Sequence, residues 1–160
     1  MKIIHAKPED LDTVYEIESI SFPETEAAKK SEIEDRLKRN PDYFWMCEEN
    51  GAVSAFIHGY PTNESNLCDD MFHNFKYYDE SGAWLMLISV ATLPSYRKKG
   101  CASLVMDAVI DDSRKDGRKG IVLTCKEALI PFYSKFGFSN EGVSASTHGG
   151  AVWYQMRLIF

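Results

Sequence analysis

The amino-acid sequence predicts one α/β domain built around a mixed sheet, and three stretches carry this prediction. Asn50-Gly51 separates two β-rich runs, and this dipeptide supplies the positive φ angles of a tight hairpin turn. The run AWLMLISVATL at 83–93 is apolar on both strand faces, which is typical of a central strand. The segment after Gly100 has apolar residues at helical spacing. Together these elements indicate an α/β domain with a mixed sheet.

The other elements follow from apolar spacing and from turn-forming residues. The expected order is β-α-α-β-β-β-α-β-α-β-β in one domain over 1–160, without repeats or linkers. We expect strands at about 2–5, 43–49, 52–60, 83–93, 120–125, 138–143 and 151–159, and helices at about 9–20, 28–39, from 101 to a stop at Gly117, and 128–136. Residues 61–82 are polar and aromatic, and we expect a long loop there with a short helical piece.

Each predicted helix has one apolar face that we expect to be buried. The members of these faces are Leu11, Val14, Ile17 and Ile20, then Ile33 and Leu37, then Cys101, Leu104, Val105, Ala108 and Val109, and finally Ala128, Leu129, Phe132, Tyr133 and Phe136. Pro131 is compatible with the last helix only in its first turn, and Gly137 is expected to end that helix.

Composition and charge exclude several classes of function. The net charge of −6 argues against broad binding of nucleic acid. None of the four cysteines belongs to a C-x-x-C pair or stands at zinc-ligand spacing, so we expect no metal site and reduced thiols in a cytoplasmic protein. The first apolar run is too short for a signal peptide, and 84–91 is far shorter than the roughly 20 residues that span a bilayer. We therefore expect no membrane association.

Three cations stand together in this acidic chain. Arg97, Lys98 and Lys99 precede Gly100 and join the predicted central strand to a predicted helix. A helix N-terminus presents unpaired N–H groups and a partial positive charge, and glycine lets a ligand approach the backbone closely. The combination favours a polyanion, most simply a pyrophosphate, over the alternative of a solvated basic turn. The glycine patterns of P-loops and dinucleotide-binding folds are both absent.

Two motifs resemble those of the GNAT superfamily of N-acetyltransferases. LISVATLPSYRKKGCASLVM is similar to its acetyl-CoA-binding motif, and CKEALIPFYSKFGF is similar to a second motif around a short helix. The latter stretch and YEIESISFPETEA most resemble the arylalkylamine (serotonin) N-acetyltransferase branch. The resemblance implies a mostly antiparallel central sheet flanked by helices. It also implies acetyl-CoA as cosubstrate, without a metal.

The resemblance further implies roles for individual residues. In the family, backbone amides of the glycine-containing turn hold the CoA pyrophosphate, and the pantetheine arm bonds to the central strand where that strand splays from its neighbour. A tyrosine of the second motif is the general acid for the CoA thiolate, which here is Tyr133. The implied CoA-binding residues are Ile88, Val90, Ala91, Thr92, Arg97, Lys98, Lys99, Gly100, Cys101, Ala102 and Ser103.

The general base departs from the resembled branch. That branch has two histidines on the central strand, and the aligned positions here are Met86 and Ile88, which cannot accept a proton. The carboxylates left as candidates on the acceptor side are Glu24, Glu26, Asp69 and Asp70, and the histidines left are His58 and His73. Each of them has an ordinary structural explanation as well.

Three functional hypotheses remain open at this stage. The first is an acetyl-CoA-dependent N-acetyltransferase acting on a small primary amine, such as an arylalkylamine or a polyamine. The second is a non-catalytic acyl-CoA-binding or sensor module, which the loss of the strand histidines favours and Tyr133 disfavours. The third is an acetyltransferase for peptide or protein amines. The sequence leaves a homodimer open.

Overall fold

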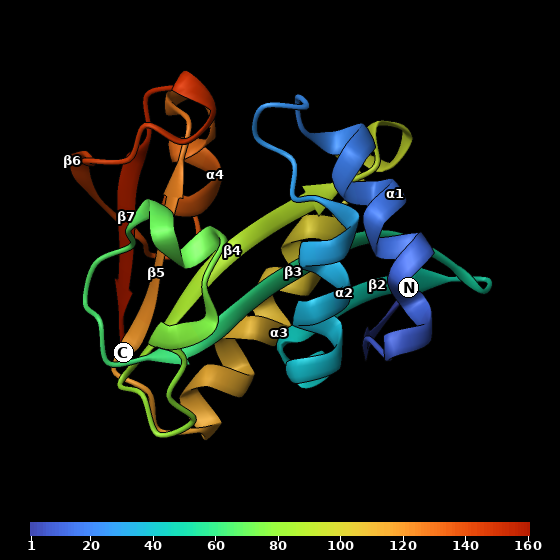
Figure 1. Ribbon diagram of the computed structural model, residues 1–160, viewed down its shortest axis with the longest axis horizontal. Helices are drawn as coiled ribbons and strands as arrows, with labels where there is room; N and C mark the ends of the chain where they lie inside the picture. The colour runs from blue at the N-terminus through green and yellow to red at the C-terminus, as the bar shows by residue number, and fades with distance from the viewer. The chain divides into compact units, whose positions relative to one another are not determined.

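Seven strands form one sheet in the order β1-β2-β3-β4-β5-β7-β6 in a computed structural model that describes residues 1–160 (Figure 1). The strands are β1 (Lys2–His5), β2 (Phe44–Glu49), β3 (Ala52–Thr62), β4 (Trp84–Thr92), β5 (Gly120–Cys125), β6 (Ser139–Val143) and β7 (Tyr154–Ile159). The helices are α1 (Leu11–Ser21), α2 (Lys30–Arg39), α3 (Cys101–Lys115) and α4 (Ile130–Ser134). The predicted element order and the α/β class with a mixed sheet are confirmed.

The chain forms two compact units. The first contains Met1–Gly59 and Ser89–Asp111, and the second contains Tyr60–Ile88 and Asp112–Phe160. β3, β4 and α3 each run from one unit into the other. None of the helices combines the length and the apolar character that crossing a membrane would need.

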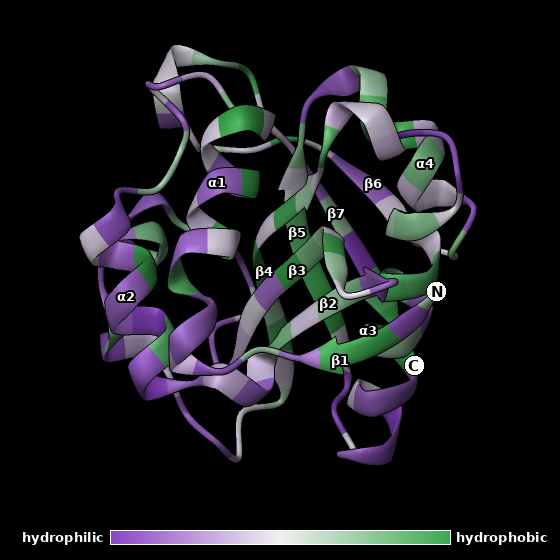
Figure 2. Ribbon diagram, turned by 90° about the vertical axis from the view of Figure 1, so that its right-hand side faces the viewer, coloured by the Kyte–Doolittle hydropathy of each residue, from purple (hydrophilic) through white to green (hydrophobic).

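In the first unit, the predicted hairpin connects β2 and β3. Asn50 and Gly51 have φ angles of 52° and 80°, and β2 pairs antiparallel with both β1 and β3. α1 and α2 lie side by side on one face of these strands, where Ile17 and Leu37 pack against Phe44 (Figure 1). The rest of α2 is mainly hydrophilic (Figure 2), as expected of a helix with one buried face.

The first part of α3 also belongs to this unit, and its buried face differs from the predicted one. Cys101, Val105, Met106 and Val109 are buried, whereas Leu104 is 39% exposed. The prediction was therefore wrong for Leu104, whose place on the buried face is taken by Met106. Cys101 faces inward, because its thiol lies 3.6 Å from the Sδ atom of Met1 and beside the Cys47 thiol of β2.

In the second unit, β5 pairs antiparallel with β7 along its whole length, and β7 pairs with β6. The last predicted helix is shorter than expected. α4 spans only Ile130–Ser134 behind a 3-10 turn at Glu127–Leu129, and Leu129 is 47% exposed. Pro131 explains this difference, because a residue without an N–H group is accommodated only in the first turn of a helix. Ala128 and Leu129 therefore do not join the buried face.

The loop after β3 carries structure of its own. β3 extends to Thr62, and the loop contains two 3-10 turns, at Asp69–Phe72 and Phe75–Tyr77. This agrees with the expected short helical piece. Leu67 and Met71 of the loop are buried against Tyr60 and Met86, so the loop contributes to the core of the second unit.

Candidate functional site

The basic turn has an unusual backbone conformation. Lys98 and Gly100 both have positive φ angles, of 61° and 87°, and such angles are uncommon outside glycine. Leu104 N–H donates to the carbonyl of Gly100 at 3.0 Å, so α3 begins its hydrogen-bond ladder there. The N–H groups of Cys101, Ala102 and Ser103 precede this bond and point out of the helix N-terminus. The turn therefore offers a row of backbone donors.

Positive side chains surround these donors. Arg97, Lys98 and Lys99 are exposed, and Arg97 Nε donates to the carbonyl of Thr92 at 3.3 Å. Lys99 Nζ lies 5.6 Å from the ring centre of Tyr96. A Cβ atom added to Gly100 would meet no atom within 4 Å, so the backbone is open to a ligand on that side. This arrangement is suited to the phosphates of a nucleotide-containing ligand.

The strand leading to this turn loses its neighbour on one side. β4 pairs in parallel with β5 at Trp84–Gly120, Leu85–Ile121 and Met86–Val122 only. β4 continues to Thr92 and β5 continues to Cys125 beyond the last pair. Unpaired strand backbone of this kind offers N–H and C=O groups to a ligand. The predicted contact residues Ile88, Val90 and Thr92 are half-buried on this part of β4.

Sequence reasoning missed a buried pair beside this strand. Glu18 of α1 is 4% exposed, and its Oε1 accepts a hydrogen bond at 2.6 Å from the hydroxyl of Ser89, which is 7% exposed. Its Oε2 accepts from the N–H of Ala28 at 3.0 Å. One signal was available, because position 18 follows Val14 by one helical turn and so continues the apolar face with a carboxylate.

Tyr133 lies in α4 and is 3% exposed. Its ring meets those of Phe132 and Phe138, with centres 5.0 and 6.0 Å apart. Burial and the neighbouring Cys125 thiol raise the pKa of the phenol, so it remains protonated at neutral pH. Burial also raises the pKa of Cys125 to about 11, which disfavours a nucleophilic thiolate there.

The acidic candidates of the loop have partners in the second unit. Asp69 accepts hydrogen bonds from the hydroxyl of Ser146 and, at 3.1 Å, from the N–H of Thr147. Asp70 accepts from the hydroxyl of Tyr77 at 2.9 Å and pairs with Lys76 at 3.2 Å. These two contacts, the tyrosine bond first, lower the pKa of Asp70. Both carboxylates therefore hold the loop in its conformation.

The acidic candidates of the first unit lie between α1 and α2. Glu24 is exposed, and Glu26 is half-buried with its Oε1 atom enclosed. The Ala28 N–H that Glu18 holds belongs to the same connection. Glu24 and Glu26 therefore lie in the segment that Glu18 ties to α1.

The two histidine candidates differ in their surroundings. His58 is 1% exposed and stacks on Phe44 with ring centres 3.9 Å apart. Burial, and then the charge of Arg36, hold its pKa well below the usual range, so the ring is neutral. His73 is exposed, and its ring centre lies 6.2 Å from that of His148. His58 is consequently a core residue of the first unit.

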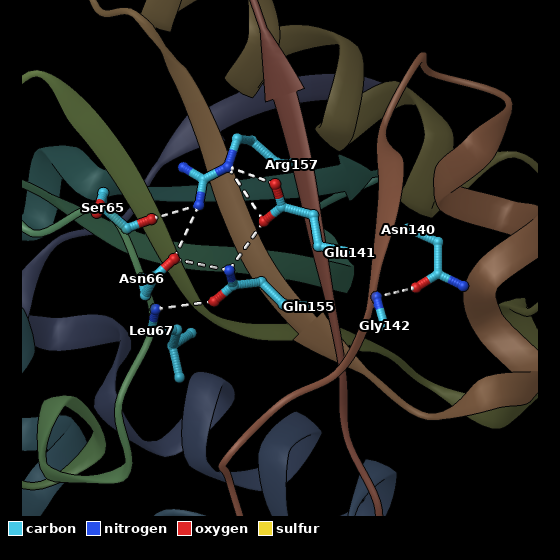
Figure 3. A network of polar contacts seen from close by, with 8 residues as sticks. All are labelled: Ser65, Asn66, Leu67, Asn140, Glu141, Gly142, Gln155 and Arg157. Carbon is cyan, nitrogen blue, oxygen red and sulfur yellow. Dashed lines mark hydrogen bonds and ion pairs between the residues drawn. The ribbon is translucent and has the colours of Figure 1, made fainter.

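A polar network fixes the start of the loop (Figure 3). Arg157 of β7 donates to both carboxylate oxygens of Glu141 and, at 2.6 Å, to the carbonyl of Ser65. Gln155 donates to Asn66 at 2.9 Å and accepts from the N–H of Leu67 at 3.2 Å. The loop is thus attached to β7 at 65–67 and to the β6–β7 connection at Asp69.

Comparisons with known proteins agree with this geometry. The chain is 27% identical over 154 residues to serotonin N-acetyltransferase of Mesocricetus auratus, covering 94% of this chain and 73% of that protein. Among solved structures, the GphF GNAT-like decarboxylase in complex with isobutyryl-CoA has a TM-score of 0.86 at 17% identity, with 99% of each chain covered. Ard1 of Thermoplasma volcanium has a TM-score of 0.75 at 21% identity, with 99% of this chain and 96% of that chain covered.

A family comparison gives the same result over most of the chain. Residues 11–138 match the acetyltransferase (GNAT) family, a range that runs from the start of α1 to just beyond α4 and includes the basic turn and Tyr133. With the strand, turn and helix arranged as described, the match identifies this chain as a member of the acetyltransferase (GNAT) family.

Proposed function

We propose that this acetyltransferase transfers the acetyl group of acetyl-CoA directly to a small primary amine, with an arylalkylamine as the favoured class. The observation that supports acetyl-CoA binding is the turn from Arg97 to Ser103. Exposed backbone N–H groups and cations lie there at the N-terminus of α3. In this proposal the turn holds the CoA pyrophosphate. The unpaired part of β4, at Ile88, Val90, Ala91 and Thr92, holds the pantetheine arm.

The transfer needs one bond to form and one to break. The neutral amine nitrogen attacks the thioester carbonyl, a C–N bond forms, and the C–S bond breaks with the electron pair leaving on sulfur. The nitrogen loses one proton to a base on the acceptor side or to solvent, which leaves a neutral amide. A backbone N–H near Val90 polarises the carbonyl oxygen as negative charge develops. Tyr133 donates its proton to the departing thiolate. The raised pKa keeps this proton on the phenol but makes the phenol a weaker acid, so transfer requires the charge on sulfur to be well developed.

The loop at 61–82 and the sequence similarity to a known enzyme support the choice of acceptor. The loop brings together aromatic rings, with Phe75 stacked on Tyr78 at 4.9 Å. Aromatic faces suit an ammonium group with an apolar body. The similarity to serotonin N-acetyltransferase points to the same class.

The decisive experiment is acetyl-CoA-dependent release of CoA thiol over a panel of amines. The panel contains tryptamine, phenethylamine, spermidine and short peptides, together with a control that lacks amine. Release with the arylalkylamines supports the proposal. Release with peptides alone would assign the protein to peptide or protein acetylation. Tight acetyl-CoA binding without release would assign it to the non-catalytic acyl-CoA-binding modules.

A further inference from the structure

We propose that Glu18 is a positioning residue that sets the unpaired part of β4 for acetyl-CoA and ties the α1–α2 connection to the same strand. This inference rests on the proposed function, because it assigns β4 the role of holding the pantetheine arm. Glu18 itself is too deeply buried to touch the ligand, at 4% exposure. Its effect passes through Ser89 and Ala28.

The first observation is the contact with β4. Ser89 stands between Ile88 and Val90, and its hydroxyl donates to Glu18 Oε1 at 2.6 Å. Side chains alternate between the two faces of a strand. A hydrogen bond from the Ser89 side chain on one face therefore restrains the orientation of the N–H and C=O groups of Ile88 and Val90. β4 has no pairs with β5 here and keeps β3 as its neighbour on the other edge only, so Glu18 adds a restraint to a strand that is paired on one side.

The second observation is a parallel contact one helical turn further along α1. The hydroxyl of Ser21 donates to the carbonyl of Thr92 at 3.3 Å. Thr92 is the last residue of β4 and also accepts from Arg97 Nε of the basic turn. α1 therefore holds β4 at two places, Ser89 and Thr92, which enclose Val90 and Ala91 of the stretch that the proposed function assigns to the pantetheine arm.

The third observation is the second oxygen of the same carboxylate. Glu18 Oε2 accepts the N–H of Ala28 at 3.0 Å, so one side chain holds both β4 and the connection that carries Glu24 and Glu26. The two donors are a hydroxyl and an N–H group, neither of them a cation. A buried carboxylate satisfied in this way is unfavourable as a simple packing residue, since an apolar side chain would avoid its desolvation. The two hydrogen bonds, which connect β4 with the α1–α2 connection, are a reason for a carboxylate at this position.

The test uses Ser89→Ala, Glu18→Gln, the double variant and the matched control Glu16→Gln. Glu16 is exposed on the same helix and undergoes the same change of charge. We would measure the dissociation constant of acetyl-CoA by calorimetry, the KM of acetyl-CoA and of the accepted amine, and the melting temperature. A hydrogen bond to a charged acceptor is worth roughly tenfold to a hundredfold in an equilibrium constant. We therefore expect about a tenfold weaker acetyl-CoA affinity for Ser89→Ala, with the amine KM unchanged.

Glu18→Gln replaces one acceptor oxygen by an N–H₂ group, so one of the two partners loses its acceptor. We expect a loss of acetyl-CoA affinity similar to that of Ser89→Ala. The double variant should be no worse than Ser89→Ala, because the remaining amide oxygen can then serve Ala28 alone. Glu16→Gln should behave like the parent. A purely structural role would lower the melting temperature without moving the acetyl-CoA constants.

The experiment distinguishes a failure of the proposed function from a failure of the inference about Glu18. If the parent neither binds acetyl-CoA nor acetylates an amine, the proposed function and this inference both fall. If the parent binds and acetylates while Ser89→Ala retains parental acetyl-CoA affinity, only this inference is overturned. Strictly additive losses in the double variant would overturn it as well, because Glu18 and Ser89 would then act independently.

Discussion

Replacing Gly100 by alanine strains the basic turn without filling any space. The φ angle of Gly100 is 87°, and an L residue in this left-handed region costs about 1–2 kcal/mol. A Cβ atom at this position would meet nothing within 4 Å, so no clash adds to the strain. The predicted loss in free energy of unfolding is therefore about 1–2 kcal/mol, which lowers the melting temperature by roughly 2–8 °C.

Gly51 provides a matched control in the β2–β3 hairpin. Its φ angle is 80°, and an added Cβ would also meet nothing within 4 Å. Gly51→Ala should therefore lower the melting temperature as much as Gly100→Ala does. The two variants differ in where the strain acts. The turn at Gly100 can relieve it by rotating the N–H groups that the proposed function assigns to the pyrophosphate.

The assay is the dissociation constant of acetyl-CoA for both variants at equal folded fraction. Each hydrogen bond lost to a charged phosphate oxygen is worth about 1.5–3 kcal/mol, so Gly100→Ala should weaken binding roughly tenfold or more. Gly51→Ala should leave it unchanged. Equal acetyl-CoA affinity in the two variants, with equal melting temperatures, would refute the assignment of the turn.

Three further predictions concern single side chains. Tyr133→Phe should lower kcat by roughly a hundredfold or more while acetyl-CoA affinity stays within twofold. Since the pKa of this phenol is raised, the alkaline limb of the pH–rate profile due to Tyr133 should lie above pH 10 in the parent. Parental turnover in the variant would remove Tyr133 from the mechanism. The pKa of His58 is lower in the folded than in the unfolded protein, so its contribution to stability is complete above about pH 6.5 and declines below it by up to about 1.4 kcal/mol per pH unit. Urea unfolding between pH 6.5 and 5 should show a shallower loss for His58→Gln than for the parent or for His73→Gln, and identical slopes would contradict the neutral assignment. Glu141→Gln should weaken the contact that Arg157 Nε makes with both carboxylate oxygens. We expect faster hydrogen exchange at 65–67, which mass spectrometry of the loop peptide would detect.

The fold was predictable where local patterns and tertiary packing agree. The Asn50-Gly51 turn, the apolar run of β4 and the spacing of α1 and α2 each form the predicted element. The errors concern single positions on the predicted buried faces. Ile20 of α1 and Leu104 of α3 are 51% and 39% exposed although their spacing suits those faces. Pro131 delays the start of α4, so Leu129 is exposed although its spacing suits a helix face.

Only those residues of the candidate site that are adjacent in the sequence were predictable as a group. Gly100 and the cations before it are adjacent in the sequence, so their combination is visible without a structure. Glu18 and Ser89 are 71 positions apart, and their bond depends on how α1 packs beside β4. Asp69 shows the reverse case: its carboxylate reads as an acceptor-side candidate in the sequence, whereas the fold engages it with Ser146.

The structure also bears on which side chain accepts the proton that leaves the amine. The aligned strand positions are Met86 and Ile88, His58 is neutral and enclosed, and Asp69 and Asp70 each accept from two donors. The bonds from Tyr77 and Lys76 lower the pKa of Asp70, which makes this carboxylate a weaker base. Glu24 and Glu26 are the sequence candidates of the first unit, in the connection that Glu18 holds through Ala28. Both therefore stay predictions for the acceptor-side base, and the tie between Glu18 and β4 joins their segment to the strand assigned to the pantetheine arm.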